Sequence, residues 1–293
     1  MAKNEKSCER QIIFNGRPLL IRGIYVSKWS DIYYFFLSAR WPTLFVILAA
    51  FYIIVNGIFA GLYLLGGDCI LNARPGSLWD AFFFSVQTWA TIGYGAMAPK
   101  THYADILVAI ESFSGLLSMS IVTGLVFAKF ARPRSKVRFT QKILMSRFDG
   151  KNVLMLRLGN MRGNQIVEAK IRVVYAAESK TAEGQMFRRL LDLQLIRDSN
   201  ALFSLTWQVM HVIDESSPLW QLTQSEFVNR KAQIIVSMAG TDEEFNQTVH
   251  ARHIYGVDNI EWHQRFDDIL TSENGVSVID YQKFDHLVPL VKA

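Results

Sequence analysis

Two long apolar stretches dominate the pattern of hydrophobic and polar positions along the chain. Between Trp41 and Leu65 there is no Asp, Glu, Lys or Arg, and the 25 residues would reach roughly 37 Å as a helix. A second apolar stretch runs from about residue 104 to 131, and the carboxylate of Glu111 stands out within it. Because a hydrocarbon core is about 30 Å thick, each stretch predicts a transmembrane helix, TM1 (41–65) and TM2 (104–131).

A shorter apolar segment lies between the two predicted spans. Ser77 is a suitable N-cap for a helix over residues 78–90, which is too short to cross a membrane. We interpret this segment as a re-entrant pore helix that enters the membrane and stops. It leads directly into the motif Thr91-Ile92-Gly93-Tyr94-Gly95. Residues 41–132 therefore read as one transmembrane pore domain.

The residues before the first span show a different pattern. Residues 1–28 are polar and basic, and they predict a cytoplasmic arm in which residues 11–13 and 19–21 can add short strands. Residues 29–40 place apolar side chains at helical spacing on one side. A helix of this length cannot span a bilayer, so we expect an amphipathic helix that lies in the membrane interface.

Beyond Pro133 the hydrophobic period changes from helical to two. Phe203, Leu205, Trp207 and Val209 alternate with polar or smaller side chains, and a similar alternation runs over residues 170–175. Turn dipeptides punctuate these runs at Asp149-Gly150, Glu183-Gly184 and Asn274-Gly275. The pattern predicts an antiparallel, immunoglobulin-like β-sandwich over residues 133–293.

Composition and charge narrow the functional classes. The net charge is +5, but the basic residues are spread along the chain, which does not favour nucleic-acid binding. Many of them flank the apolar stretches, so the positive-inside rule places both termini in the cytoplasm and both spans in a plasma (inner) membrane. The sequence contains no CxxC pair, P-loop or GxGxxG motif, and its six histidines are scattered. We therefore expect neither an enzyme nor a cofactor.

The motif at residues 91–95 fits the chemistry of a dehydrated potassium ion. Such an ion needs oxygens in place of its water shell, and inward-pointing backbone carbonyls of a Thr-x-Gly-Tyr-Gly loop supply them. Glycines tolerate the alternating backbone conformations that this requires. One loop cannot surround an ion, so the motif predicts four chains around K⁺ held at Thr91, Ile92, Gly93 and Tyr94.

Taken together, these features resemble the inward-rectifier potassium channel family in its prokaryotic form, over residues 29–285. Apart from the filter, the resemblance rests on Asp31-Ile32 leading to Arg40-Trp41 and on three stretches of the sandwich. Those stretches are Gly159-Asn160-Met161-Arg162 with Ile166-Val167-Glu168-Ala169, His211-Val212-Ile213-Asp214-Glu215-Ser216-Ser217-Pro218-Leu219, and Ile260-Glu261-Trp262. The family implies a homotetramer with a two-span pore module and a cytoplasmic sandwich that extends the ion path.

The resemblance also assigns gating positions. Gly115 and Gly124 align with the bend of the inner helix, although glycines in membrane helices are also packing sites. Phe127 aligns with the bulky residue that closes the inner-helix crossing. Gly240 aligns with a second, cytoplasmic constriction, and Met119 with a position that lines the central cavity.

Further positions concern lipids, blockers and bracing of the filter. The resemblance places Arg40, Lys129, Arg132, Arg134 and Arg162 near anionic or phosphoinositide headgroups, where general surface attraction is the alternative interpretation. Gln87 and Met97 replace an acid and a base that brace the filter in eukaryotic members, so Gln87 and Glu111 become the candidate supports.

The positions that bind pore blockers predict weak rectification. Met119 offers no charge in the cavity, and Ala239 removes one of two cytoplasmic acidic rings. Glu168 alone remains to attract polyamines or Mg²⁺.

Two other functions stay open from the sequence. One is a cation channel of weak selectivity, and the other is a membrane-tethered β-sandwich binding module without conduction. The ratio of potassium to sodium permeability separates the first, and the absence of any flux identifies the second.

Overall fold

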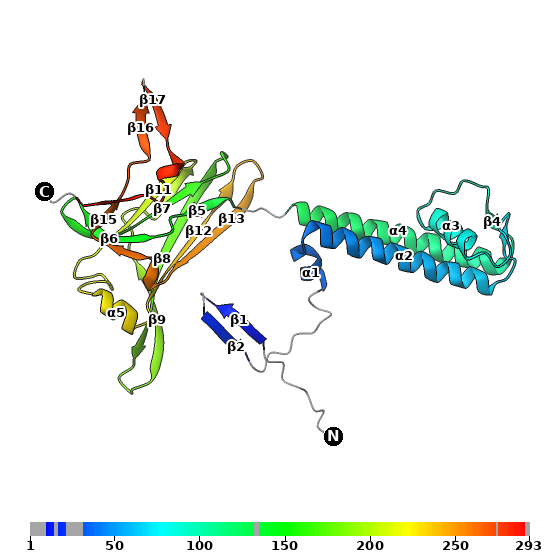
Figure 1. Cartoon of the computed structure of the whole chain (residues 1–293), viewed down its shortest axis with the longest axis horizontal. Coiled ribbons are helices and arrows are strands. Elements are labelled where there is room, and N and C mark those ends of the chain that lie inside the picture. Colours follow the sequence, from blue (N-terminus) through cyan, green and yellow to red (C-terminus); the bar gives the residue numbers. More distant parts are fainter. Residues whose placement is uncertain (1–9, 15–16, 22–31, 132–134, 274, 291–293) are drawn as a thin grey trace. The chain divides into compact units, whose positions relative to one another are not determined.

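The chain divides into two compact units, residues 1–132 and residues 133–293, which we describe separately (Figure 1). The structure is a computed structural model, and it describes residues 10–14, 17–21, 32–131, 135–273 and 275–290. In the first unit, β1 (Arg10–Phe14) and β2 (Arg17–Ile21) pair as an antiparallel two-stranded sheet. The short strands expected in the N-terminal arm are thus confirmed.

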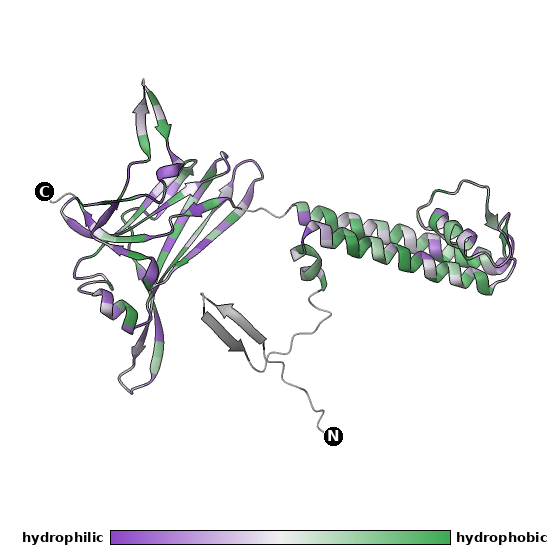
Figure 2. Ribbon diagram, viewed as in Figure 1, coloured by the Kyte–Doolittle hydropathy of each residue, from purple (hydrophilic) through white to green (hydrophobic). Residues whose placement is uncertain are grey.

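The helical part of the first unit contains two membrane-length helices. The helices α2 (Trp41–Leu65) and α4 (His102–Phe130) are long and apolar enough to cross a membrane. Hydrophobic residues predominate along both of them in Figure 2, and most of these side chains find no cover within the chain. The other elements of this part are α1 (Ile32–Ser38), β3 (Ile70–Leu71), α3 (Leu78–Trp89) and β4 (Ala98–Pro99), of which β3 and β4 pair.

The start of α3 follows local rules. The Ser77 side chain accepts a hydrogen bond from the Asp80 amide, as expected of an N-cap. Asp80 also holds the Arg74 guanidinium at 2.9 Å, which fixes the loop that leads into the helix. With 12 residues, α3 is about 18 Å long, too short to cross a bilayer. This length agrees with the prediction of a helix that does not span the membrane.

The second unit is built on two five-stranded sheets. One has the order β10-β8-β12-β13, with β9 also paired to β8, and the other has the order β11-β7-β6-β14, with β5 also paired to β7. The strands of the first sheet are β8 (Ile166–Lys180), β9 (Met186–Leu193), β10 (Ser199–Phe203), β12 (Gln233–Asp242) and β13 (Gln247–Tyr255). Those of the second are β5 (Val137–Phe139), β6 (Ile143–Phe148), β7 (Lys151–Asn160), β11 (Thr206–Val212) and β14 (Ile260–Trp262).

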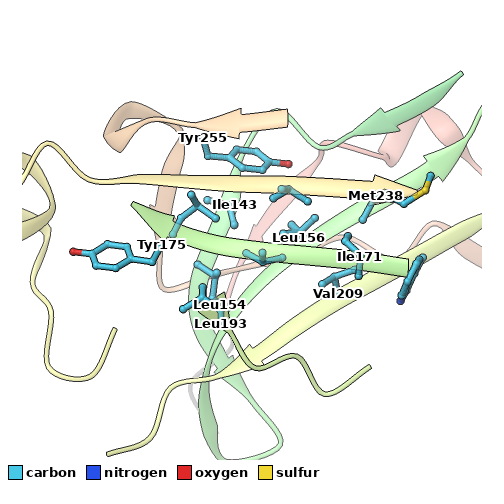
Figure 3. Packing of buried hydrophobic residues seen from close by; sticks show 14 of the residues in the cluster. Ile143, Leu154, Leu156, Ile171, Tyr175, Leu193, Val209, Met238 and Tyr255 are labelled. Carbon is cyan, nitrogen blue, oxygen red and sulfur yellow. The ribbon is translucent and has the colours of Figure 1, made fainter. Parts of the chain in front are cut away.

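The core of this unit lies between the two sheets. Leu154, Leu156 and Val209 from one sheet meet Ile171 and Met238 from the other (Figure 3). Each of these side chains is at most 5% exposed. The turn between β6 and β7 uses Asp149-Gly150, both at positive φ, as the hairpin signal in the sequence predicted.

Smaller elements complete the second unit. Two short antiparallel pairs join β15 to β18 and β16 to β17. These elements are α5 (Gln224–Asn229), the 3₁₀ turns η1 (Val257–Asn259) and η2 (Tyr281–Lys283), β15 (Gln264–Phe266), β16 (Leu270–Glu273), β17 (Val276–Ile279) and β18 (Leu287–Pro289).

Two details of the sandwich differ from the sequence prediction. The predicted run from Phe203 to Val209 is not one strand, because the chain turns at residues 204 and 205 and passes from one sheet to the other. Leu205 is therefore 53% exposed, although Phe203 and Trp207 are buried. In addition, β14 pairs with β6 in parallel, so the second sheet is mixed rather than purely antiparallel.

A buried histidine joins β11 to the loop that follows it. His211 Nδ1 lies 2.6 Å from the Gln194 carbonyl oxygen, and Nε2 lies 2.7 Å from Ser217 Oγ. Since a carbonyl only accepts, Nδ1 donates and Nε2 accepts from the Ser217 hydroxyl. The same Ser217 oxygen accepts from the Leu219 amide at 3.1 Å. Burial lowers the pKa of His211, because the charged ring would lose its hydration.

This arrangement predicts a loss of stability on acidification. The unfolded chain takes up a proton at His211 near the usual value of about 6.5, whereas the folded chain resists it. The neutral His211 ring therefore stabilises the folded chain in full above a pH of about 6.5, and this stabilisation declines as the pH falls below that value. The apparent melting temperature of the purified protein should drop between pH 7.5 and pH 5.5. His211→Asn should reduce this drop, and the exposed His250→Asn should leave it unchanged.

Candidate ion-conducting site

The backbone at residues 91–95 alternates in handedness. Thr91, Gly93 and Gly95 have φ values of 56°, 55° and 81°, whereas Ile92 and Tyr94 do not adopt positive φ. Such alternation turns successive carbonyl groups to the same side of the strand, as a filter requires. The two glycines adopt positive φ without steric cost, but a β-branched threonine there is strained by on the order of 1–3 kcal/mol. Strain of this kind is typical of functional backbone.

The filter segment is held by the last turn of α3. The Ile92 amide donates to the Gln87 carbonyl oxygen at 2.8 Å, and the Gly93 amide approaches the same oxygen at 3.4 Å. Gln87 thus supports the filter through its backbone. Gln87 and Met97 also line a cavity of about 340 Å³ between the filter and α4. The two positions where eukaryotic members carry an acid and a base therefore share one hollow behind the filter.

The filter is uncovered within a single chain. Tyr94 is 76% exposed and Ile92 is 44% exposed. Backbone carbonyls that are not hydrogen-bonded cannot face lipid at membrane depth, since lipid tails offer them no partner. The geometry of this segment thus calls for neighbouring copies.

Behind α3 lies a buried polar cluster from three helices. Glu111 of α4 is fully buried, and its Oε2 accepts a hydrogen bond from the Tyr63 hydroxyl of α2 at 2.7 Å. The Ser85 hydroxyl of α3 contacts Glu111 Oε1 and lies 2.9 Å from Asn56 Oδ1. The Asn56 amide in turn donates to the Tyr52 carbonyl at 2.8 Å. Glu111 therefore supports the pore helix, not the filter directly.

The two candidate hinge glycines differ in their surroundings. A Cβ atom at Gly115 would lie 2.4 Å from the Trp89 carbonyl oxygen, so α4 packs on the last turn of α3 at this point. A Cβ atom at Gly124 would meet nothing within 4 Å in the described part of the chain. Close packing thus explains Gly115 without a hinge, whereas the hinge prediction for Gly124 stays a prediction.

The predicted cavity and gate residues lie on exposed surface of α4. Met119 is 69% exposed and Phe127 is 73% exposed within one chain. Both are free to face a central axis in an assembly. Their roles in lining and closing a pore stay predictions.

Glu168 and Gly240, predicted separately from the sequence, lie at one irregularity of the sandwich. The pairing of β8 with β12 shifts between Ala239 and Thr241, and Glu168 adopts φ 50° opposite this point. A Cβ atom at Gly240 would lie 3.0 Å from Ala169 Cα. The β-bulge changes the direction of the exposed Glu168 side chain. The bulge in turn requires a glycine at position 240, on the facing strand.

The five predicted lipid contacts have different surroundings. Arg40 is exposed. Arg162 forms an ion pair with the buried Asp242 at 3.4 Å. Lys129 is buried, with its ammonium group on backbone carbonyls. Arg132 and Arg134 lie outside the described residues.

The sequence reasoning missed the partners of Glu111. Asn56 and Tyr63 are polar side chains within an otherwise apolar span, and Ser85 lies within the pore helix. Polar residues at membrane depth are costly and pair with one another. That signal identifies them as a set, but their spacing in the sequence does not show that they meet.

We expect the polar cluster to respond to hydrogen-bonding capacity more than to charge. Glu111→Ala leaves the Tyr63 hydroxyl without its partner and leaves Ser85 with Asn56 alone, and an unpaired buried polar group costs about 1–3 kcal/mol. Glu111→Gln keeps one acceptor for Tyr63 and supplies a donor for Ser85. The midpoint of thermal dissociation of the assembled protein should fall clearly for Glu111→Ala and little for Glu111→Gln. Equal losses for the two variants would show that the negative charge itself is required.

Comparison with known proteins agrees with this geometry. Residues 137–292 match the family model for the inward rectifier potassium channel C-terminal domain, and residues 25–132 match one described as ion channel. The inward rectifier potassium channel Kirbac3.1 of Paramagnetospirillum magnetotacticum is 41% identical over 267 residues, which cover 90% of each chain.

Two animal proteins are also similar. The inward rectifier potassium channel irk-1 of Caenorhabditis elegans is 29% identical, over 89% of this chain and 52% of that protein. The human ATP-sensitive inward rectifier potassium channel 8 is 29% identical, over 75% of this chain and 54% of that protein. This chain spans about half the length of these two relatives. The match of both units and the identity to the bacterial protein show that the chain belongs to the inward rectifier potassium channel family, in its prokaryotic form.

Proposed function

We propose that four copies of this chain form a pore that conducts potassium ions across a plasma membrane. The observation that carries the proposal is the alternation of positive φ at Thr91, Gly93 and Gly95. Carbonyl groups turned to one side can replace the water shell of K⁺ only when several chains contribute. The exposure of Tyr94 supports the same conclusion, because a neighbouring chain would cover it.

The topology we propose places both termini and the sandwich in the cytoplasm. Two spans return the chain to the side on which it started, and the basic residues that flank them favour the cytoplasmic side. The sandwich would then surround the ion path below the membrane. Four Glu168 carboxylates would line that path, and the bulge around Gly240 would form its narrow part.

The gate we propose is a ring of four Phe127 side chains near the cytoplasmic end of α4. Bulky apolar rings close pores by steric block and by dewetting. The open surroundings of Gly124, three residues before Phe127, leave α4 free to bend there.

Anionic lipid headgroups are the membrane partners we propose. The exposed Arg40 and the basic residues after α4, Arg132 and Arg134, would meet the negatively charged leaflet, at about 1 kcal/mol for each residue. Arg162 would contact a headgroup only while its guanidinium group also pairs with Asp242. Polyamines or Mg²⁺ would block weakly, because Met119 gives the cavity no charge.

Ion flux into liposomes tests the conduction proposal. The purified chain should admit K⁺ at least tenfold faster than Na⁺, and Ba²⁺ should block the flux. Gly93→Ala should abolish the preference, because a Cβ atom disfavours φ 55°. Gly67→Ala is the matched control, since Gly67 also has positive φ but lies outside the filter.

Each alternative function predicts a different result in this assay. Equal K⁺ and Na⁺ rates would indicate a weakly selective cation channel. No flux from a stable tetramer would favour the tethered binding module. A monomer or dimer that still conducts would contradict the fourfold filter.

The gate prediction uses the exposed positions of α4. Phe127→Ala should raise basal K⁺ flux severalfold, because a smaller ring leaves the closed pore wider. Ile121→Ala removes an exposed apolar side chain from a different side of α4 and should have little effect. Unchanged flux for Phe127→Ala would move the gate to the filter or to the bulge around Gly240.

A further inference from the structure

Lys129, in the last turn of α4, contacts the end of α1 through its ammonium group. Lys129 is only 7% exposed. Its Nζ lies 3.2 Å from the Phe36 carbonyl oxygen, 3.0 Å from that of Leu37 and 2.5 Å from that of Ala39. The same ammonium group lies 5.3 Å from the centre of the Trp41 ring.

These contacts use the full bonding capacity of the side chain. An ammonium group has three N–H donors, and three carbonyl acceptors surround it here. The acceptors belong to the end of α1, where backbone carbonyls lack partners within the helix. A cation at this end also meets the negative pole of the helix dipole. Lys129 therefore has no donor left for a lipid phosphate while these bonds persist.

The contacts also involve the beginning of α2. Trp41, the first residue of α2, faces the Lys129 ammonium group on one side and the Phe130 ring at a centroid distance of 4.4 Å. The final turn of α4 is thus fixed to the corner between α1 and α2. Arg40 occupies the same corner, yet its side chain is exposed.

The buried positions of α4 form one narrow face. Ala104, Glu111, Gly115 and Lys129 fall within about 40° of one another around the helix, at about 100° per residue. At its outer end this face packs on α3, and at its inner end on α1. Phe127 lies about 160° away from Lys129, on the opposite side of the helix. A displacement of α1 would therefore push α4 from behind the proposed gate residue.

We propose that Lys129 is a positioning residue that fixes the interfacial helix to the inner end of α4, so that α1 and Phe127 move together. The inference rests on the proposed gate. It reverses the role that the sequence predicted, because Lys129 acts on backbone carbonyls and not on lipid headgroups. Its effect on the gate should accordingly persist in membranes without anionic lipid.

The first experiment measures the attachment without any conduction. Amide hydrogen exchange of the full-length assembly should show a loss of protection on the order of tenfold over residues 34–39 in Lys129→Met. Methionine keeps the apolar stem but has no donors. Lys129→Arg keeps charge and donors, so it should restore most of the protection, and Arg40→Gln should change nothing in α1. Unchanged exchange in Lys129→Met, with the tetramer intact by native mass spectrometry, would overturn the proposal.

The second experiment separates positioning from lipid binding. Potassium flux is measured in liposomes of phosphatidylcholine alone and with increasing phosphatidylglycerol. Lys129→Met should change the flux severalfold in phosphatidylcholine alone, with the relative response to phosphatidylglycerol preserved. Arg40→Gln, at an exposed basic position, should weaken the response to phosphatidylglycerol.

Two outcomes would contradict the inference. An effect of Lys129→Met that appears only with phosphatidylglycerol would make Lys129 a lipid ligand. Increased exchange in α1 with unchanged flux would show that the contact between Lys129 and α1 does not affect the gate. If no variant conducts, the proposed function fails, and the exchange experiment still decides whether Lys129 holds α1.

Discussion

A backbone that offers its carbonyls to an ion cannot use them in a helix or a sheet. This constraint governs the first unit of the protein. The segment from Thr91 to Gly95 alternates in backbone handedness and makes a few hydrogen bonds to α3 at its start. It therefore depends on its surroundings for its shape, and at membrane depth those surroundings must be protein. The ring of four chains that is typical of the family would provide them.

Within one chain, the buried contacts of α2 and α4 stabilise the pore helix α3. Glu111, Ser85 and Tyr63 join α4, α3 and α2 in a buried polar cluster, and Gly115 lets α4 approach the last turn of α3. Polar bonds in an apolar setting have few competing partners, so they fix the helices in one arrangement. An acid and a base behind the filter are therefore not required for this chain to hold its pore helix.

The same face of α4 meets α1 at its other end. Lys129 satisfies the terminal carbonyls of α1 in the way that polar side chains satisfy helix ends in soluble proteins. One helix thus contacts the pore helix α3 near one end and α1 at the other. In the second unit, one β-bulge brings two predicted positions together, because Glu168 adopts positive φ opposite the register shift and Gly240 leaves room for the backbone of Ala169.

The sequence by itself determined the features that depend on neighbours along the chain. The lengths of α2 and α4, the cap at Ser77 and the Asp149-Gly150 turn all follow from local patterns, and so does the filter motif. Only the tertiary structure decided which of the distant polar groups meet. A charge near a membrane predicts lipid contact equally well for Arg40 and Lys129, yet one side chain is exposed and the other is buried on the carbonyls of α1. The physical reason is that such a bond joins residues about ninety positions apart, and hydrophobic periodicity carries no information about that distance.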